Sequence, residues 1–187
     1  MLAVMQRIPY PDFEQLPEAT RRTLANVPLN IVRICAHASQ PLFEAQGQLG
    51  RAVATPEVLE PRLRETLILR VAYLSQSAYE LHHHIPLGRA AGLSESELAA
   101  IEAGEYDRLP PLLAAAARFT DEVVTKIVPA DEALAALRSL VSDQVIVNMV
   151  LAIGCYMSIA RLAAVTGIGQ DADALGHLPG SLDGGRD

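Results

Sequence analysis

Signals for the ends of helices recur along almost the whole chain, and no segment sustains the alternation of apolar and polar residues that marks a half-buried β-strand. Ser77 and Ser94 each begin an S-x-x-E pattern, the form of a capping box at a helix start. Gly92 stands where a left-handed residue ends a helix. The sequence therefore predicts an all-α fold of eight or nine helices. The expected helices cover 12–26, 29–39, 41–51, 61–74, 77–91, 94–103, 110–128, 129–141 and 142–165.

The longest apolar stretch is VIVNMVLAIGCYMSIA, residues 145–160. It is shorter than the eighteen or more residues that a bilayer span needs, and it contains Asn148 and Ser158. A short helix that is apolar nearly all round is typical of a large core or of a subunit interface. We therefore expect no integral membrane protein.

Composition and charge narrow the function classes further. Half of the residues are hydrophobic and the mean hydropathy is +0.21, which excludes a disordered chain. The net charge of −7 argues against nucleic acid or an anionic membrane as a partner. Cys35 and Cys155 are too few for a disulfide framework, and the N-terminus does not resemble a signal peptide. We expect a cytoplasmic protein with a single domain over residues 1–168 and a flexible acidic tail over 169–187.

One polar cluster could carry chemistry, the segment SQSAYELHHHIPLGRAAG that begins at Ser75. Three of the five histidines stand there in a row, and His84 lies one helical turn after Glu80. His82 and His83 are rotated away from His84 by about 100° per residue, so at most two of the three point the same way. We expect His82 and His83 to lie at the surface or at an interface.

Glu65 is the second candidate, because its helical neighbours are apolar. Burial disfavours the charged form of a carboxylate, which prepares it to act as a general acid or base. Arg64 and Arg62 are close in sequence, so a structural ion pair is the alternative for Glu65.

Structural alternatives also remain for the polar cluster. Ser77 and Glu80 form a capping box, which is compatible with a place at the mouth of a pocket. Glu80 and His83 have the i, i+3 spacing found in di-iron helical bundles, but no second Glu-x-x-His occurs in the chain. We therefore expect no metal site.

The segment RETLILRVAYLSQSAYELHHHIPLGRAAGLSESEL, which begins at Arg64, resembles the core motif of the carboxymuconolactone decarboxylase-like, alkylhydroperoxidase-D-like superfamily. The peroxidase branch has a glutamate, a cysteine twelve residues later, a second cysteine after two more residues, and a histidine after a further three. Glu65 and His84 take the glutamate and histidine positions without a gap, and Ser77 and Glu80 take those of the cysteines. The segment IGCYMSIARLAAVTGI, 153–168, resembles the closing helix of the family. The resemblance covers roughly residues 40–168, which leaves a helical extension before it.

This departure from the motif decides which reaction the resemblance implies. Dithiol peroxide reduction needs one thiolate to attack and a second thiol to resolve, and Ser77 and Glu80 can do neither. The resemblance instead implies a lyase-like acid/base reaction on a small carboxylated or lactone-type metabolite, with no cofactor. His84 would handle the proton and Glu65 would orient it. The remaining expected roles go to Tyr79 or Ser77 at a substrate oxygen, to Glu80 in substrate binding, and to Arg161 or Arg70 at a carboxylate.

Two other functions stay open at this point. One is an alkylhydroperoxidase-like oxidoreductase without the dithiol motif. The other is a non-catalytic ligand-binding protein, since the relatives implied by the resemblance assemble as closed oligomers, here expected to be a trimer or a hexamer. A Glu65 carboxylate within about 3.2 Å of a His84 ring nitrogen would favour catalysis over the non-catalytic role.

Overall fold

The computed structural model describes residues 6–174, and this part of the chain contains α-helices and short 3-10 turns but no β-strand. The all-α prediction is therefore confirmed. The α-helices are α1 (Glu18–Asn26), α2 (Asn30–Cys35), α3 (Gln40–Ala54), α4 (Pro61–Leu74), α5 (Ala78–Ala90), α6 (Glu95–Ala103), α7 (Pro111–Lys126), α8 (Asp131–Arg138) and α9 (Asp143–Thr166).

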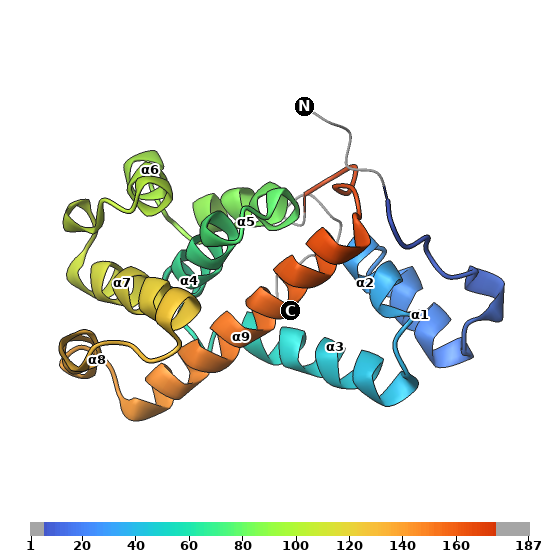
Figure 1. Ribbon diagram of the computed structural model, residues 1–187, viewed down its shortest axis with the longest axis horizontal. Coiled ribbons are helices and arrows are strands. Elements are labelled where there is room, and N and C mark those ends of the chain that lie inside the picture. The colour runs from blue at the N-terminus through green and yellow to red at the C-terminus, as the bar shows by residue number, and fades with distance from the viewer. Residues whose placement is uncertain (1–5, 175–187) are drawn as a thin grey trace, which may run out of the picture.

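The helices form two groups that α9 connects (Figure 1). Helices α4 to α8 lie on one side of α9, and α1 to α3 lie on the other. The most heavily buried helix is α4, in which every residue from Leu63 to Ala72 is buried. It packs against α5, α7 and α9. Any polar side chain that points inward from α4 is therefore removed from water.

A tight turn folds α5 back against α4. Gln76 adopts a left-handed conformation with φ 51°, and the Ser77 amide donates to the Ala72 carbonyl. Ser77 then caps α5, because its hydroxyl accepts from the Glu80 amide. The turn thus brings the middle of α5 alongside the middle of α4.

The two predicted capping boxes differ in outcome. Ser94 and Glu97 form the complete reciprocal box at the start of α6. At the start of α5 only the Ser77 half is present, because the Glu80 carboxyl turns toward His84 instead of the cap. The prediction of a full box at Ser77 is therefore wrong. The Glu80 side chain, which the S-x-x-E pattern assigns to the cap, is therefore available to a functional site.

Smaller departures from the expected helices occur in two places. The first expected helix, 12–26, is a 3-10 turn at Phe13–Gln15 followed by α1, with Pro17 at the junction. A further 3-10 turn at Tyr106–Arg108 precedes α7. Neither change affects which helices surround α4.

Helix α9 spans 24 residues and is long and apolar enough, by length and composition alone, to cross a membrane. It is therefore longer than the apolar stretch that the sequence singled out. Its inner face contributes Met149, Ala152 and Ile153 to the main core and packs against α3, α4 and α7, as a core helix does. Its outer face exposes Val147, Leu151 and Val165. The trimer or hexamer stays a prediction.

The segment after α9 is held against α2 and α5 over its first residues. The Asn30 side chain donates to the carbonyls of Gly169 and Gln170, and the backbone amide of Asn30 donates to Asp171. The packed part of the chain therefore extends at least to Asp171 instead of ending at residue 168. The rest of the expected tail, 175–187, lies outside the described residues.

Candidate functional site

Glu65 of α4 and His84 of α5 meet in the interior. The Nδ1 atom of His84 lies 2.8 Å from Oε2 of Glu65, and the two residues are only 4% and 1% exposed. Because Glu65 accepts the proton on Nδ1, the other ring nitrogen, Nε2, faces away from Glu65 and is the one that can exchange protons with a further group. The distance meets the criterion set from the sequence.

Arg64 occupies the other oxygen of Glu65. Its Nε atom donates to Oε1 at 3.0 Å, and its Nη1 atom donates to the carbonyl of Ala54 at the end of α3. Burial alone would raise the pKa of Glu65, but the charges and hydrogen bonds of His84 and Arg64 lower it below its usual value. Glu65 is therefore a carboxylate, and the ion pair and the pairing with His84 exist together.

Glu80 approaches His84 from the opposite side of the ring. Its Oε2 atom lies 3.5 Å from Nε2, and the residue is 3% exposed. Burial raises the pKa of Glu80, as does the nearby negative charge of Glu65, and the His84 charge only partly offsets these effects. The pKa values of the two carboxyl groups that flank the imidazole are thus shifted in opposite directions. In enzymes this pattern distinguishes the acid from the base.

The imidazole itself favours its charged form. Burial alone would lower the pKa of His84, but Glu65, and then Glu80, raise it above its usual value. The ring of Tyr156 from α9 contacts the imidazole edge to face, with centroids 5.0 Å apart and planes at 90°. The site therefore favours the imidazolium form of His84 and has an aromatic ring on one side of it.

Tyr79 does not join this group. Its hydroxyl donates to Oδ2 of Asp171 at 2.6 Å and accepts from the Ile31 amide at 3.2 Å. The Nε2 atom of His83 lies 3.0 Å from the same Asp171 oxygen, and the Tyr79 and His83 rings touch edge to face. Tyr79 is therefore part of a second cluster, centred on Asp171, and the structure does not bring it to Glu65 and His84 as expected.

Burial and the Asp171 charge raise the pKa of Tyr79 well above its usual value, so Tyr79 stays a neutral donor. Asp171, in turn, has a lowered pKa because hydrogen bonds from His83, Tyr79 and the Asn30 amide outweigh its burial. His83 is 2% exposed, which makes the expectation of a surface or interface position wrong. We call Asp171 and the residues that donate to it, Asn30, Tyr79 and His83, the Asp171 cluster. The His84 cluster consists of Glu65, Glu80, His84, Arg64 and Tyr156.

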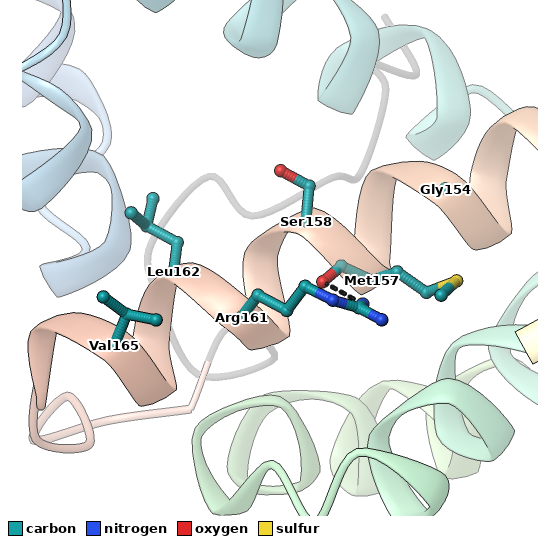
Figure 2. Close-up of a pocket in the computed structure, with 6 residues that line it drawn as sticks. All are labelled: Gly154, Met157, Ser158, Arg161, Leu162 and Val165. Atoms are coloured by element: carbon teal, nitrogen blue, oxygen red, sulfur yellow. Dashed lines mark hydrogen bonds between the residues drawn. The ribbon is translucent and has the colours of Figure 1, made fainter.

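The expected carboxylate-binding arginines lie elsewhere. Arg161 is exposed on the outer face of α9, and its Nη1 atom donates to the carbonyl of Met157 (Figure 2). It borders a shallow, open depression that a single helix lines with Gly154, Met157, Ser158, Arg161, Leu162 and Val165. Arg70 is paired with Asp121 through two hydrogen bonds. Neither guanidinium contacts the His84 cluster.

The remaining polar groups near the site do not converge on a metal. Glu80 contacts His84 whereas His83 contacts Asp171, so the i, i+3 pair does not act together. Within residues 6–174 no group of three or more His, Cys, Asp or Glu side chains is arranged to hold a metal ion. Ser77 is buried and caps α5, which makes it a structural neighbour of the site.

Sequence reasoning missed three contributors. Arg64 was considered only as the partner of an ion pair, and Tyr156 was assigned no role within the segment that resembles the closing helix. Asp171 was assigned to the tail. The i, i+4 spacing of Tyr79 and His83 was the available signal for the second cluster, because residues four apart share a helix face.

Comparison with known proteins agrees with this geometry. The sequence model of the carboxymuconolactone decarboxylase family matches residues 40–122, a range that includes Glu65, Glu80 and His84. No curated protein matches the chain.

Two solved structures are similar to it. A putative antioxidant defence protein AhpD of unknown function from Agrobacterium tumefaciens is 26% identical, with a TM-score of 0.66 over 74% of this chain and 96% of that one. An uncharacterized peroxidase-related protein with an alkylhydroperoxidase AhpD core, from Ralstonia eutropha JMP134, is 18% identical, with a TM-score of 0.77 over 90% of this chain and 93% of that one. The second likeness concerns the fold alone. The family model thus places residues 40–122, with the buried glutamate and histidine, in the carboxymuconolactone decarboxylase family, and the two structures support an AhpD-like fold.

Proposed function

We propose that the protein is a cofactor-independent acid/base enzyme that acts on a small carboxylated or lactone-type molecule. The observation that carries the proposal is the buried contact of 2.8 Å between Oε2 of Glu65 and Nδ1 of His84. It fixes the tautomer and the orientation of the imidazole, which is the role of the orienting group behind a histidine acid or base. His84 moves the proton, and Glu65 positions it.

The charge state of the site favours proton donation. Because Glu65 and Glu80 raise the pKa of His84, the imidazolium form, which has a proton to give from Nε2, is more favoured than in an ordinary histidine. In a decarboxylation the bond between carbon and the carboxylate breaks, carbon dioxide leaves, and the electron pair ends on a carbon that takes the proton from Nε2. Water then reprotonates His84 and leaves hydroxide, which the released carbon dioxide takes up as bicarbonate. Atoms and charge balance without a cofactor.

An oxidoreductase reaction is the alternative that the descriptions of the two similar structures suggest. It would need a reactive thiolate. Positions 77 and 80 hold serine and glutamate, and Cys155 is buried, accepts a hydrogen bond from Gln46 and has a pKa raised by burial. Its thiol therefore stays protonated, which favours the acid/base reaction.

Ultraviolet-monitored turnover of a carboxymuconolactone tests the proposal. We expect the purified chain to consume the compound and the Glu65→Gln and His84→Ala variants to lose most of the rate. A rate unchanged in both variants would exclude the Glu65–His84 pair as the reactive centre. Binding without turnover, for this and related lactones, would favour the non-catalytic alternative.

A further inference from the structure

The His84 cluster contains two polar atoms whose bonding capacity the protein does not use. Nδ1 of His84 is bonded to Glu65, whereas Nε2 makes only the 3.5 Å contact with Glu80, which is too long for a charge-assisted hydrogen bond. Within residues 6–174, no hydrogen bond joins the Glu80 carboxyl to another group. Because their hydrogen-bonding capacity is not filled by the described residues, these groups are available to a ligand.

The surrounding charges decide which form Glu80 takes. From α4 it faces Glu65, from its own helix His84, and from α9 Cys155 and Tyr156. Arg64 is committed to Glu65 and to the Ala54 carbonyl, so among the described residues His84 is the one cation in contact with Glu80, and it is shared with Glu65. Glu65 has two positive partners and stays ionised. Of the two carboxyl groups, Glu80 is therefore the one on which a proton is favoured, in agreement with the direction in which burial and Glu65 shift its pKa.

We infer that Glu80, as a neutral carboxylic acid, and the His84 imidazolium form a pair of hydrogen-bond donors for one negatively charged oxygen of the substrate. Oε2 of Glu80 and Nε2 of His84 lie 3.5 Å apart, from residues one helical turn apart on α5, so one ligand oxygen can reach both. Two fixed donors in a site that excludes water stabilise developing negative charge strongly, because they need no reorganisation. Glu80 thus belongs to the catalytic machinery as a donor and is not an ionised partner of His84.

The ligand class follows from this donor set. An oxygen with negative charge accepts from both groups, whereas an ammonium is repelled by the charged His84, whose ring offers no acceptor. Carboxylates and enolates are such ligands. In the proposed reaction, on which this inference rests for its substrate, breaking the carbon–carboxylate bond sends electrons onto the lactone carbonyl oxygen, and this enolate oxygen is the one that the two donors would hold.

Acetate is a small probe for the donor pair, and its binding does not require turnover. We expect saturable binding of isotope-labelled acetate to the full chain at neutral pH, followed by nuclear magnetic resonance. Glu80→Gln keeps a neutral donor of the same size and should change the affinity by less than about threefold. Glu80→Ala removes the donor and should weaken binding by about tenfold or more, the cost of one hydrogen bond to a charged group.

The matched control is Glu95→Gln on α6, whose carboxylate is exposed and paired with Arg89. This change should leave acetate binding unchanged. The inference is overturned if Glu80→Gln weakens acetate as much as Glu80→Ala does, because the negative charge of Glu80 would then be what matters. It is also overturned if acetate does not bind saturably to the wild-type chain.

Infrared difference spectroscopy gives a second measurement that does not depend on the folding of Glu80→Ala. The wild-type protein at neutral pH should show the carbonyl stretch of a neutral carboxyl group, and Glu80→Gln should lose that band while Glu95→Gln keeps it. A band that is unchanged in Glu80→Gln would show that the band does not come from Glu80. Glu80 would then be ionised and could not donate to the substrate oxygen, which would overturn the inference.

These results separate the inference from the proposed function. Acetate binding with the expected pattern but no turnover of any lactone would leave the donor pair in place and reject the enzyme reaction. Turnover that depends on His84, together with equal acetate affinities in Glu80→Gln, Glu80→Ala and the wild type, would retain the reaction and reject the role of Glu80.

Discussion

Two adjacent histidines of α5, His83 and His84, each contact a carboxyl group, yet the two clusters differ in how their charges are satisfied. In the Asp171 cluster a single carboxylate receives hydrogen bonds from Tyr79, His83 and the Asn30 amide. In the His84 cluster a single imidazole lies between two carboxyl groups, and one of these has no hydrogen-bond donor. The Asp171 carboxylate thus accepts three hydrogen bonds, whereas the Glu80 carboxyl and Nε2 of His84 have hydrogen-bonding capacity that the described residues do not fill.

The contrast suggests which histidine serves structure and which serves chemistry. Asp171 joins residues from α2 and α5 to the segment after α9, so its bonds hold together parts of the chain that are far apart in sequence. Glu65 and Glu80 instead leave the ring of His84 charged and its Nε2 available. The predictions below test this division of roles.

The largest expected effect is on turnover by His84→Gln. Glutamine can still donate to Glu65 but cannot carry a proton, so the rate constant for a lactone substrate should fall by about 10²–10⁴-fold, the contribution typical of a general acid. His83→Gln should leave the rate within about threefold of the wild type. Steady-state kinetics on both variants provide the measurement, and equal losses would abolish the distinction.

The next effect concerns stability. Asp171→Asn keeps one acceptor oxygen but places an amide N–H among the donors from Tyr79, His83 and Asn30. The free energy of unfolding should drop by about 2 kcal/mol, since bonds to a charged acceptor contribute about 1.5–3 kcal/mol each. Urea denaturation measures the change. The exposed variant Asp107→Asn, at a residue paired with Arg118, should cost less than about 0.5 kcal/mol.

The pH dependence of that difference has a definite sign. The pKa of Asp171 is lowered in the folded state, so its contribution to stability is present above the unfolded pKa of about 3.9 and is lost as the pH falls through the lower folded value. The gap between the wild type and Asp171→Asn should therefore narrow in strong acid. A gap that widens there would contradict the charged form of Asp171.

The contribution of the His84 cluster to stability should instead be lost as the pH rises. A raised folded pKa means that the stabilisation from the imidazolium is complete below the unfolded value of about 6.5 and is lost as the pH rises through the folded value. The free energy of unfolding of the wild type should decrease there by at most about 1.4 kcal/mol per pH unit. Denaturation at a series of pH values should show that His84→Gln lacks this component.

The smallest effect is expected from Gly88→Ala on α5. A Cβ atom at Gly88 would lie 3.2–3.3 Å from side-chain atoms of Leu93, Leu69 and Leu98. Crowding costs about 1–3 kcal/mol, whereas alanine gains about 1 kcal/mol in helix propensity. The free energy of unfolding should therefore decrease by about 1 kcal/mol. Because the crowding pushes α5 away from α4, the rate should fall a few-fold while the Asp171 cluster is spared. Gly154→Ala, at a position with open space, is the matched control.

The helices were predictable because their ends are encoded locally. Ser94 and Glu97 specify the start of α6 within four residues, and Pro61 stands at the start of α4. The pairing of Glu65 with His84 was accessible through its spacing and the family resemblance, because a short turn between two packed helices leaves little choice of register. Local signals of this kind also explain why the order of elements agrees with the prediction.

Contacts that depend on distant segments were not accessible. Asp171 lies 92 residues from Tyr79, and nothing near it in sequence distinguishes it from the other aspartates after residue 168. Tyr79 was placed with His84, but five residues on a helix correspond to a rotation of about 140°, which puts the two on different faces. Arg161 was expected at a carboxylate, whereas the outer face of α9 holds it away from the buried groups.

The adjacency of His83 and His84 has a consequence for the transfer of function between relatives by alignment. A shift of one position within the run His82–His84 pairs histidine with histidine and leaves the similarity score nearly unchanged. Yet it exchanges the imidazole that faces Glu65 for the one that binds Asp171. Homologues of this chain are therefore aligned reliably here only when their counterparts of Glu65 and Asp171 are aligned as well.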